Sequence, residues 1–261
     1  MSERPAPRIG FVLGGVQKGG TTALARYLGR HPALALPLQK EAHVFDAPDF
    51  DDGADVAAVD ARYAAHFAQA AQAGVLHGDA TPIYLLHRRF VERIARYNPA
   101  MRWVILLRDP VDRALSQYHM EHGRGDEHLP LWLALLAERW RLRGHGDDFS
   151  HGSPLRHWSY RLRGDYVTQL EVLYRHFPRE QVLVLRNREL ARDPAATVAR
   201  VHAFLGVAAP RDDADYSRVF EGEYARWSRR SWRRRLLRWW WRKDLARQAR
   251  MGLDWNADDG H

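Results

Sequence analysis

Between Phe11 and Leu24 the chain reads FVLGGVQKGGTTAL, and its architecture follows from these fourteen residues. A run of apolar residues ends at a glycine-rich turn that carries one lysine, and two threonines then open a helical pattern. A strand, loop and helix in this order direct backbone N–H groups and the positive end of the helix dipole at a bound anion. The stretch therefore predicts a phosphate-binding loop at the end of the first strand of an α/β domain.

The loop nearly fits the nucleotide-binding pattern G-x-x-x-x-G-K-[ST] starting at Gly14, but its lysine is displaced. That pattern places the lysine after the last glycine, whereas Lys18 precedes Gly19 and Gly20. A plain tight turn is the simpler interpretation, but adjacent glycines followed by two threonines favour an anion site. We expect a phosphate or phosphosulfate to be held by Gly15, Gln17, Lys18, Gly19, Gly20, Thr21 and Thr22.

Length and composition limit the protein class. A chain of 261 residues, 46% of them hydrophobic, suffices for one large α/β domain, and we expect a single domain over 1–261. The chain contains no cysteine, which excludes disulfides and thiolate chemistry within it. We see no signal peptide and no apolar run near the roughly 20 residues of a membrane helix, and we expect a cytoplasmic protein.

Apolar runs and helical patterns alternate along the chain. This alternation favours a mostly parallel sheet flanked by helices on both faces, as in P-loop proteins. The first strand is expected at Ile9–Leu13, and the apolar run Arg102–Leu107 has the character of a central strand. The alanine-rich stretch Ala54–Ala73 predicts a long helix, and Val111–Glu121 predicts a helix that Pro110 opens.

A second segment that carries chemistry is LLRDPVDRALSQY, residues 106–118. Arg108 directly follows the apolar strand, and Ser116 comes eight residues later on the expected helix. An arginine in this place can bind a phosphate with two parallel hydrogen bonds. The alternative is an arginine–aspartate pair at the helix start, formed with Asp109 or Asp112.

Together the two segments resemble the sulfotransferases that use 3′-phosphoadenosine 5′-phosphosulfate (PAPS). GVQKGGTTAL is similar to the 5′-phosphosulfate loop of that family, and LLRDPVDRALSQY is similar to its 3′-phosphate motif. The resemblance implies that Arg108 and Ser116 hold the 3′-phosphate. It also implies an in-line transfer of a sulfuryl group to an acceptor hydroxyl, with Lys18 stabilising the leaving phosphate. No metal is expected to be required.

Two further segments extend the resemblance to the heparan-type carbohydrate O-sulfotransferases and their bacterial relatives. QKEAHVFD, residues 39–46, resembles a segment whose glutamate is the catalytic base, which implies this role for Glu41. His43 is the reserve base, and a surface salt bridge with Lys40 is the alternative role of Glu41. DATPIY, residues 79–84, resembles the family's E-K-[ST]-P-x-Y segment, with Ala80 in place of its lysine. A carbohydrate hydroxyl is the first expected acceptor, and a small-molecule or lipid hydroxyl is the second.

Basic charge is concentrated near the C-terminus. Residues 226–250 carry eleven Lys or Arg, one acid and five tryptophans, within a net charge of +8 for the chain. Because the rest of the chain is not basic, nucleic acid is not an expected partner. Among these residues, Arg229 and Arg230 are candidates for binding the 3′-phosphate.

The same segment predicts a basic C-terminal helix. Its apolar residues recur at helical spacing, which favours a helix that packs them on the core and leaves its arginines in solvent. The apolar set is Trp232, Leu236, Trp239 and Trp240. Contact with an anionic membrane or an anionic glycan is the alternative.

Two other function classes stay open on the sequence. A P-loop kinase or NTPase would use ATP or GTP with Mg²⁺, against which stand the displaced lysine and Arg108 where a metal-binding aspartate would end the strand. An anion- or membrane-binding protein without enzymatic activity would rely on the basic segment alone.

Overall fold

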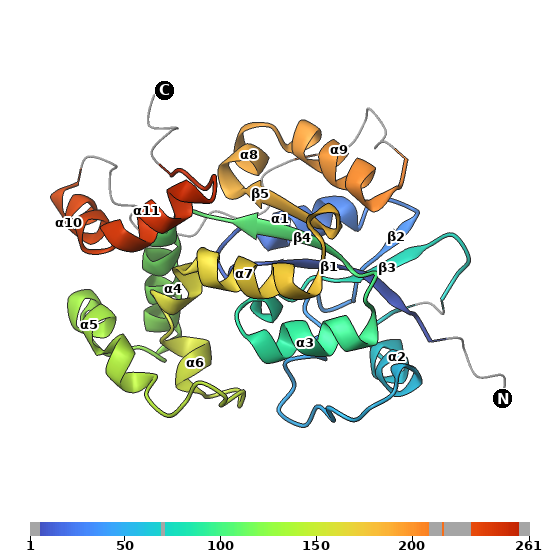
Figure 1. Ribbon diagram of the computed structural model, residues 1–261, viewed down its shortest axis with the longest axis horizontal. Coiled ribbons are helices and arrows are strands. Elements are labelled where there is room, and N and C mark those ends of the chain that lie inside the picture. The colour runs from blue at the N-terminus through green and yellow to red at the C-terminus, as the bar shows by residue number, and fades with distance from the viewer. Residues whose placement is uncertain (1–5, 69–70, 209–215, 217–230, 256–261) are drawn as a thin grey trace. The chain divides into compact units, whose positions relative to one another are not determined.

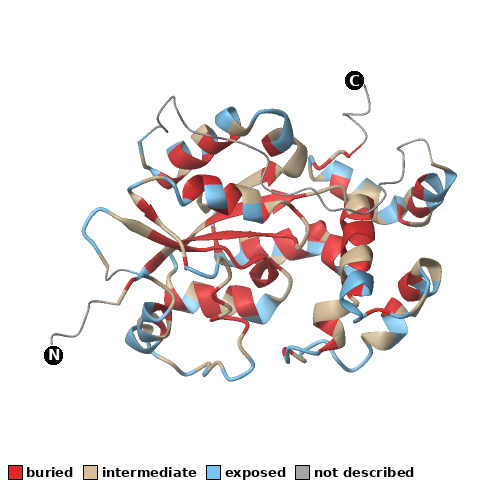
Figure 2. Cartoon of the chain, turned by 180° about the vertical axis from the view of Figure 1, so that it is seen from behind, coloured by how far each residue is buried: buried red, intermediate tan, exposed pale blue. Residues whose placement is uncertain are grey.

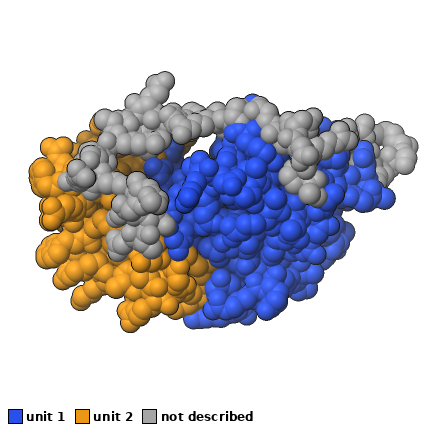
Figure 3. Space-filling view, turned by 90° about the horizontal axis from the view of Figure 1, so that it is seen from above, with its two compact units in different colours: residues 1–108, 172–221 blue, residues 109–171, 222–261 orange. Residues whose placement is uncertain are grey.

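The computed structural model describes residues 6–68, 71–208, 216 and 231–255 (Figure 1). The chain divides into two compact units (Figure 3). Unit 1 comprises residues 1–108 and 172–221, and unit 2 comprises residues 109–171 and 222–261. The single domain expected over 1–261 stays a prediction.

Unit 1 is built on a five-stranded sheet in the order β2-β3-β1-β4-β5, and every neighbouring pair is parallel. The strands are β1 (Ile9–Gly15), β2 (Leu34–Ala35), β3 (Leu76–Asp79), β4 (Arg102–Leu107) and β5 (Val182–Arg186). The apolar run predicted as a central strand is β4, whose residues 103–107 are all buried. The expected mostly parallel α/β sheet is therefore confirmed.

Helices cover both faces of this sheet, with α1 and α9 on one face and α3 on the other (Figure 1). The helices of unit 1 are α1 (Thr21–Leu28), α2 (Val56–Ala64), α3 (Arg88–Tyr97), α8 (Asn187–Arg192) and α9 (Pro194–Leu205), and a 3₁₀ turn spans Pro82–Leu85. Apolar residues of α1 and α9 share one core with the central strands. Helix α7 (Tyr166–His176) crosses from unit 2 into unit 1.

A long helix was expected over Ala54–Ala73, but the described residues of this stretch contain only the shorter helix α2, Val56–Ala64. Asp55 caps its start by accepting a hydrogen bond from the N–H of Ala58 at 2.8 Å. Just past its end, the carbonyl of His66 accepts the N–H of Leu38 at 2.9 Å. This contact lies outside the helix and joins residues far apart in the sequence, so the alanine-rich composition does not predict where the helix ends.

In the part of unit 2 that the structure describes, the regular elements are helices and no strand is present. Unit 2 contains α4 (Pro110–Arg124), α5 (Leu131–Arg141), α6 (Pro154–His157), a 3₁₀ turn (Leu162–Gly164), α10 (Trp232–Trp240) and α11 (Arg242–Arg250). Its core joins buried residues of α4, α5 and α10. Figure 2 shows the buried stripe that runs along α4.

The basic C-terminal segment is not one helix in the described residues, because α10 ends at Trp240 and α11 begins at Arg242. Of the four apolar residues predicted to pack inward, Trp240 packs partly buried against the core of unit 2, but the prediction is wrong for the other three: Trp232, Leu236 and Trp239 are exposed by 66%, 42% and 62%. Leu237 and Trp241 are buried instead.

Paired arginines explain this rotation of α10. Arg234 donates to Asp112 at 3.0 Å, and Arg238 donates to Asp109 at 2.5 Å. Both aspartates belong to the first turn of α4 or its cap. Since buried or half-buried arginines need acidic partners, these contacts fix which face of α10 turns inward.

Along the described residues, none of the helices combines the length and the apolar character that a membrane span requires.

Candidate active site

The carboxyl ends of all five strands of unit 1 carry polar residues. The loop 16–20, here called the phosphate loop, follows β1, and Arg108 follows β4. The segment 39–46, here called the acid–base loop, lies beyond β2. Because parallel strands end at one edge of the sheet, these groups gather there. Strands β3 and β4 flank β1, so the edge at the phosphate loop is the switch point where ligands of such sheets bind.

Three glycines shape the turn from β1 into α1: Gly15 ends β1, and Gly19 and Gly20 belong to the phosphate loop. A Cβ on Gly15, whose φ is +123°, would lie 2.4 Å from the carbonyl oxygen of Leu106. A Cβ on Gly19 would lie 2.7 Å from the carbonyl oxygen of Val16, and one on Gly20 would lie 2.3 Å from the side-chain nitrogen of Asn187. These close approaches exclude any side chain at the three positions without movement of the loop.

Two side chains hold the carbonyl groups of the phosphate loop. Arg108 Nη1 donates to the carbonyl of Lys18 at 3.1 Å, and Asn187 Nδ2 donates to the carbonyl of Gly19 at 2.7 Å. Since N–H and C=O point in opposite directions across a trans peptide, the second contact directs the N–H of Gly20 away from Asn187. The sequence pattern predicted Arg108 as a phosphate ligand but did not indicate Asn187, whose only signal is its place directly after β5.

The N-terminus of α1 has the character of an anion site. Gly20 is the N-cap residue and supplies no side-chain cap, and no acidic residue lies in the first turn. Thr21 is buried and Thr22 is exposed. The buried Oε1 of Gln17 has no hydrogen-bond partner among the described residues. A ligand that accepts hydrogen bonds from the backbone N–H groups at the start of α1 and donates one to Gln17 Oε1 would satisfy these polar groups.

The acid–base loop contains a chain of charged side chains. Lys40 Nζ lies 2.5 Å from Glu41 Oε1, and His43 Nε2 lies 3.4 Å from Glu41 Oε2. The other ring nitrogen of His43 lies 2.9 Å from the buried carboxylate of Asp46. His43 has φ of +53°, a left-handed conformation that is unusual for a residue with a side chain. The imidazole is thus held between two carboxylates at the cost of a strained backbone.

The same contacts shift the pKa values of both groups. Burial alone would raise the pKa of Glu41, but the hydrogen bond from His43 and the charge of Lys40 outweigh it and lower the pKa to about 2. Burial alone would lower the pKa of His43, but hydrogen bonds to Asp46 and Glu41 raise it to about 9. At neutral pH Glu41 is therefore an anion and His43 a cation.

Side chains of the segment 79–84 accept hydrogen bonds from the backbone of the acid–base loop. Thr81 Oγ1 accepts the N–H of His43 at 3.4 Å, and Tyr84 OH accepts the N–H of Val44 at 2.9 Å. Both hydroxyls donate to the buried carboxylate of Asp79, at 2.6 and 2.7 Å. Two segments far apart in the sequence therefore form one hydrogen-bonded structure, with Asp79 as its common acceptor.

Ser116 belongs to unit 2, where it is buried on α4. Asp109 caps this helix by accepting the N–H groups of Val111 and Asp112, at 2.9 and 3.2 Å. Burial raises the pKa of Asp109, the nearby charge of Asp112 raises it further, and the charges of the two arginines on α10 oppose the shift. The cap partners of Asp109 are thus backbone groups and arginines of α10.

The candidates Arg229 and Arg230 lie outside the described residues. Sequence analysis did not single out the two arginines of α10 that pair with α4. Their signal would have been the two aspartates at the start of α4, which call for cationic partners.

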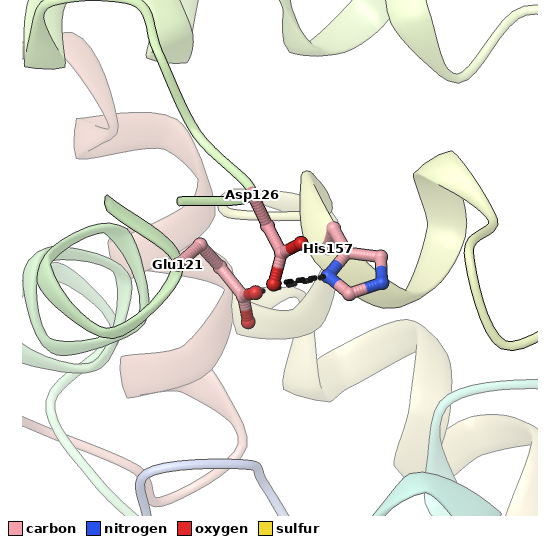
Figure 4. Close-up of side chains that lie close together, drawn as sticks. All are labelled: Glu121, Asp126 and His157. Carbon is pink, nitrogen blue, oxygen red and sulfur yellow. Dashed lines mark hydrogen bonds and ion pairs between the residues drawn. The ribbon is translucent and has the colours of Figure 1, made fainter. Parts of the chain in front are cut away.

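Three potential metal ligands also meet in unit 2 (Figure 4). Ligand atoms of Glu121, Asp126 and His157 all lie within 4.8 Å of one another. His157 Nδ1 lies 2.9 Å from Glu121 and 3.6 Å from Asp126, while Nε2 lies 2.9 Å from the carbonyl oxygen of His151. Each ring nitrogen thus lies within hydrogen-bonding distance of an oxygen atom of the chain itself. The cluster is thereby explained as an ion pair that ties α6 to α4.

A family profile described as "Sulfotransferase domain" matches residues 9–220. The chain is 31% identical over 193 residues to the human heparan sulfate glucosamine 3-O-sulfotransferase 3B1, covering 74% of this chain and 45% of that protein. It is also 31% identical over 193 residues to the human heparan sulfate glucosamine 3-O-sulfotransferase 3A1, covering 74% of this chain and 43% of that protein. The crystal structure of a sulfotransferase from Alicyclobacillus acidocaldarius matches at TM-score 0.74 and 32% identity, covering 96% of this chain and 98% of the other. The chain spans less than half the length of these human relatives.

Proposed function

This chain belongs to the sulfotransferase family, whose profile matches residues 9–220, and we propose that it moves a sulfuryl group from PAPS to a carbohydrate hydroxyl. The observation that carries the proposal is the meeting of an anion-binding loop and an acid–base loop at one edge of the sheet. Strands β2 and β1 are separated by β3, so their axes lie about 10 Å apart. That spacing leaves room for a phosphosulfate and an acceptor hydroxyl between the two loops.

The phosphate loop and the start of α1 receive the 5′ end of the donor. PAPS, when bound, supplies an activated sulfuryl group on a phosphate that becomes the leaving group. Lys18 stabilises the charge that develops on this phosphate, and the N–H groups at the start of α1 bind its oxygens. Ser116 and the basic residues near the C-terminus are proposed for the 3′-phosphate, together with Arg108. Since Arg108 also holds the loop carbonyl of Lys18, it links the two ends of the donor site.

Glu41 accepts the proton of the acceptor hydroxyl. The acceptor oxygen forms a bond to sulfur, the bond from sulfur to the bridging phosphate oxygen breaks, and 3′-phosphoadenosine 5′-phosphate (PAP) leaves. Lys40 donates one hydrogen bond to Glu41 Oε1, and the acceptor hydroxyl would donate to the same carboxylate, whose two oxygens accept several hydrogen bonds. His43 stays on Oε2 and orients the carboxylate, with Asp46 holding the far side of the ring.

A carbohydrate acceptor is supported by the two human relatives, whose names describe O-sulfation of a glucosamine. Ala80 is fully buried, so at this position the chain presents no side chain to an acceptor. A small-molecule or lipid hydroxyl is therefore the second proposed acceptor. Independence from metal ions and a cytoplasmic location are further parts of the proposal.

Two measurements test the proposal. Calorimetry should show tight binding of PAP without metal and weak binding of ATP with Mg²⁺, and the reverse order would favour a kinase or NTPase. With PAPS and a panel of glycans, mass spectrometry should detect a sulfate ester. Glu41→Gln should lower kcat by about 10²- to 10⁴-fold at unchanged PAP affinity. An equal loss of rate and PAP affinity would instead assign Glu41 to donor binding.

A further inference from the structure

Exposed large apolar side chains are unevenly distributed over the part of the chain that the structure describes. Eight such side chains are exposed, and six of them belong to α5 and α10 in unit 2. The six are Leu133, Leu136, Trp140, Trp232, Leu236 and Trp239. A concentration of this kind on a protein surface marks an interaction site.

Each of the two helices carries apolar groups on both faces. On α10 the exposed Trp232, Leu236 and Trp239 follow a spacing of four and three residues, which is one helix face. The opposite face carries Leu237 and Trp241, which are buried in the core of unit 2. Packing within the unit thus accounts for one face of α10 and leaves the other in solvent.

Helix α5 repeats this arrangement. Leu133, Leu136 and Trp140 are exposed by 52%, 62% and 77%, whereas Ala134 and Leu135 are buried in the same core as α10. Figures 1 and 2 show both helices at the same end of unit 2. The two exposed apolar rows, one on each helix, are here called the α5–α10 surface.

The charges beside these rows are positive. Residues 231–243 contain six Lys or Arg and no acid, and two of the six pair with aspartates of α4. The other four are exposed: Arg233, Arg235, Arg242 and Lys243. On α5 the exposed charge is Arg139, whereas Glu138 is buried and accepts backbone N–H groups of residues 161 and 162.

We propose that the α5–α10 surface binds the surface of an anionic lipid bilayer. Tryptophan and leucine side chains would enter the boundary between headgroups and acyl chains, which is the preferred depth of tryptophan rings. The neighbouring arginines and lysine would bind anionic headgroups. A second copy of this chain fits less well, because it would bring the same positive charge to the interface.

Vesicle sedimentation of the full chain tests the proposal. The chain should bind vesicles of phosphatidylcholine mixed with phosphatidylglycerol, bind phosphatidylcholine alone much more weakly, and lose binding as salt rises. Failure to bind the mixed vesicles at low salt overturns the proposal. Because no PAPS or acceptor is present, the result is independent of the proposed function.

Paired variants assign the binding to these helices. Trp232→Ala combined with Trp239→Ala should weaken vesicle binding at least tenfold. Leu38→Ala combined with Leu162→Ala removes two apolar residues, exposed by 71% and 42%, outside α5 and α10, and should leave binding unchanged. Equal effects of the two pairs would overturn the assignment.

A second comparison tests the charges. Arg233→Glu combined with Arg235→Glu should weaken binding about tenfold or more, since each cation near an anionic surface contributes about a fivefold factor. Arg88→Glu combined with Arg192→Glu makes the same change of charge at exposed positions of unit 1 and should have little effect. Circular dichroism verifies that all variants are folded. Equal loss in both charge pairs would show attraction by net charge alone and overturn the proposed surface.

Discussion

The phosphate loop and the acid–base loop stand at the same edge of one sheet and are built in opposite ways. In the phosphate loop, glycines allow the close approach of the backbone, and side chains from other strands hold its carbonyl groups. In the acid–base loop, side chains from the neighbouring segment accept its N–H groups. The difference matches the proposed roles: an anion would be bound by backbone N–H groups, whereas a proton would be accepted by a side chain whose backbone must not move.

Lys18→Ala should have the largest effect, because it removes the one cation of the phosphate loop. Loss of a cation that stabilises a transferring group costs about 10³-fold in kcat or more. The urea unfolding midpoint should stay near that of the unaltered chain. Arg26→Ala, which removes an exposed cation from the last turn of α1, the helix that follows the loop, is the control. Rates close to normal for Lys18→Ala would refute its proposed role.

Tyr84→Phe should loosen the acid–base loop. The hydroxyl that it removes donates to Asp79 and accepts the N–H of Val44, whereas the hydroxyl of Tyr63 contacts Asp79 without touching that loop. Each change to phenylalanine should lower the free energy of unfolding by about 1–2 kcal/mol. Only Tyr84→Phe should also lower kcat, by about ten- to a hundredfold. If Tyr63→Phe lowered kcat equally, the hydrogen bond from Val44 to Tyr84 would not be what positions the acid–base loop, and the effect would act through Asp79 alone.

Gly20→Ala should damage the phosphate loop through its backbone. The new Cβ would lie 2.3 Å from the Asn187 side chain at a φ of +98°, so the change should cost about 1–3 kcal/mol of unfolding free energy and weaken PAP binding. Gly74→Ala is the matched control, because its φ is +81° but no atom lies within 4 Å of the added Cβ. It should cost less stability and leave PAP affinity unchanged. Similar PAP affinities in both variants would mean that the Asn187 contact does not shape the site.

Asp46→Asn should lower the pKa of His43 from about 9, because it removes the stronger of the two carboxylates that stabilise the imidazolium. NMR titration of the ring measures this shift. Asp49→Asn changes an exposed aspartate that pairs with Arg62 and should leave the titration unaltered. An unchanged pKa in Asp46→Asn would mean that Glu41 alone holds the charge.

These pKa values also predict how stability depends on pH. The pKa of His43 is raised above its ordinary 6.5, so its contribution is complete below pH 6.5 and is lost as pH rises through about 9. The pKa of Glu41 is lowered from 4.5, so its contribution is complete above pH 4.5 and is lost as pH falls toward about 2. Urea unfolding should therefore show the largest difference between the unaltered chain and Glu41→Gln between pH 4.5 and 6.5.

The sequence predicted the sheet better than the contacts between its loops. Local patterns sufficed for β1 and β4, since a buried parallel strand is a continuous apolar run. The pairing of Asp79 and Tyr84 with the acid–base loop depends on contacts across about forty residues, and no local period encodes it. The contact of Asn187 with Gly19 spans 168 positions and was missed for the same reason.

The C-terminal segment shows the limit of helical periodicity. Its pattern assigned Trp232 and Trp239 to the core, because apolar residues at helical spacing usually pack inward. The structure turns Arg234 inward instead, toward the aspartates that begin α4. A periodic pattern reveals that a face exists, but the charges of the partner helix decide which face is buried.

The ion pairs between α10 and α4 also have an electrostatic consequence for the binding of the proposed donor. Asp109 is bonded through one peptide link to Arg108, a residue assigned to an anion with several negative charges. Without α10, two carboxylates at the start of α4 would be left without their arginine partners, and their field would oppose an approaching nucleotide. The end of the chain thus adjusts the local potential at a motif more than a hundred residues earlier in the sequence.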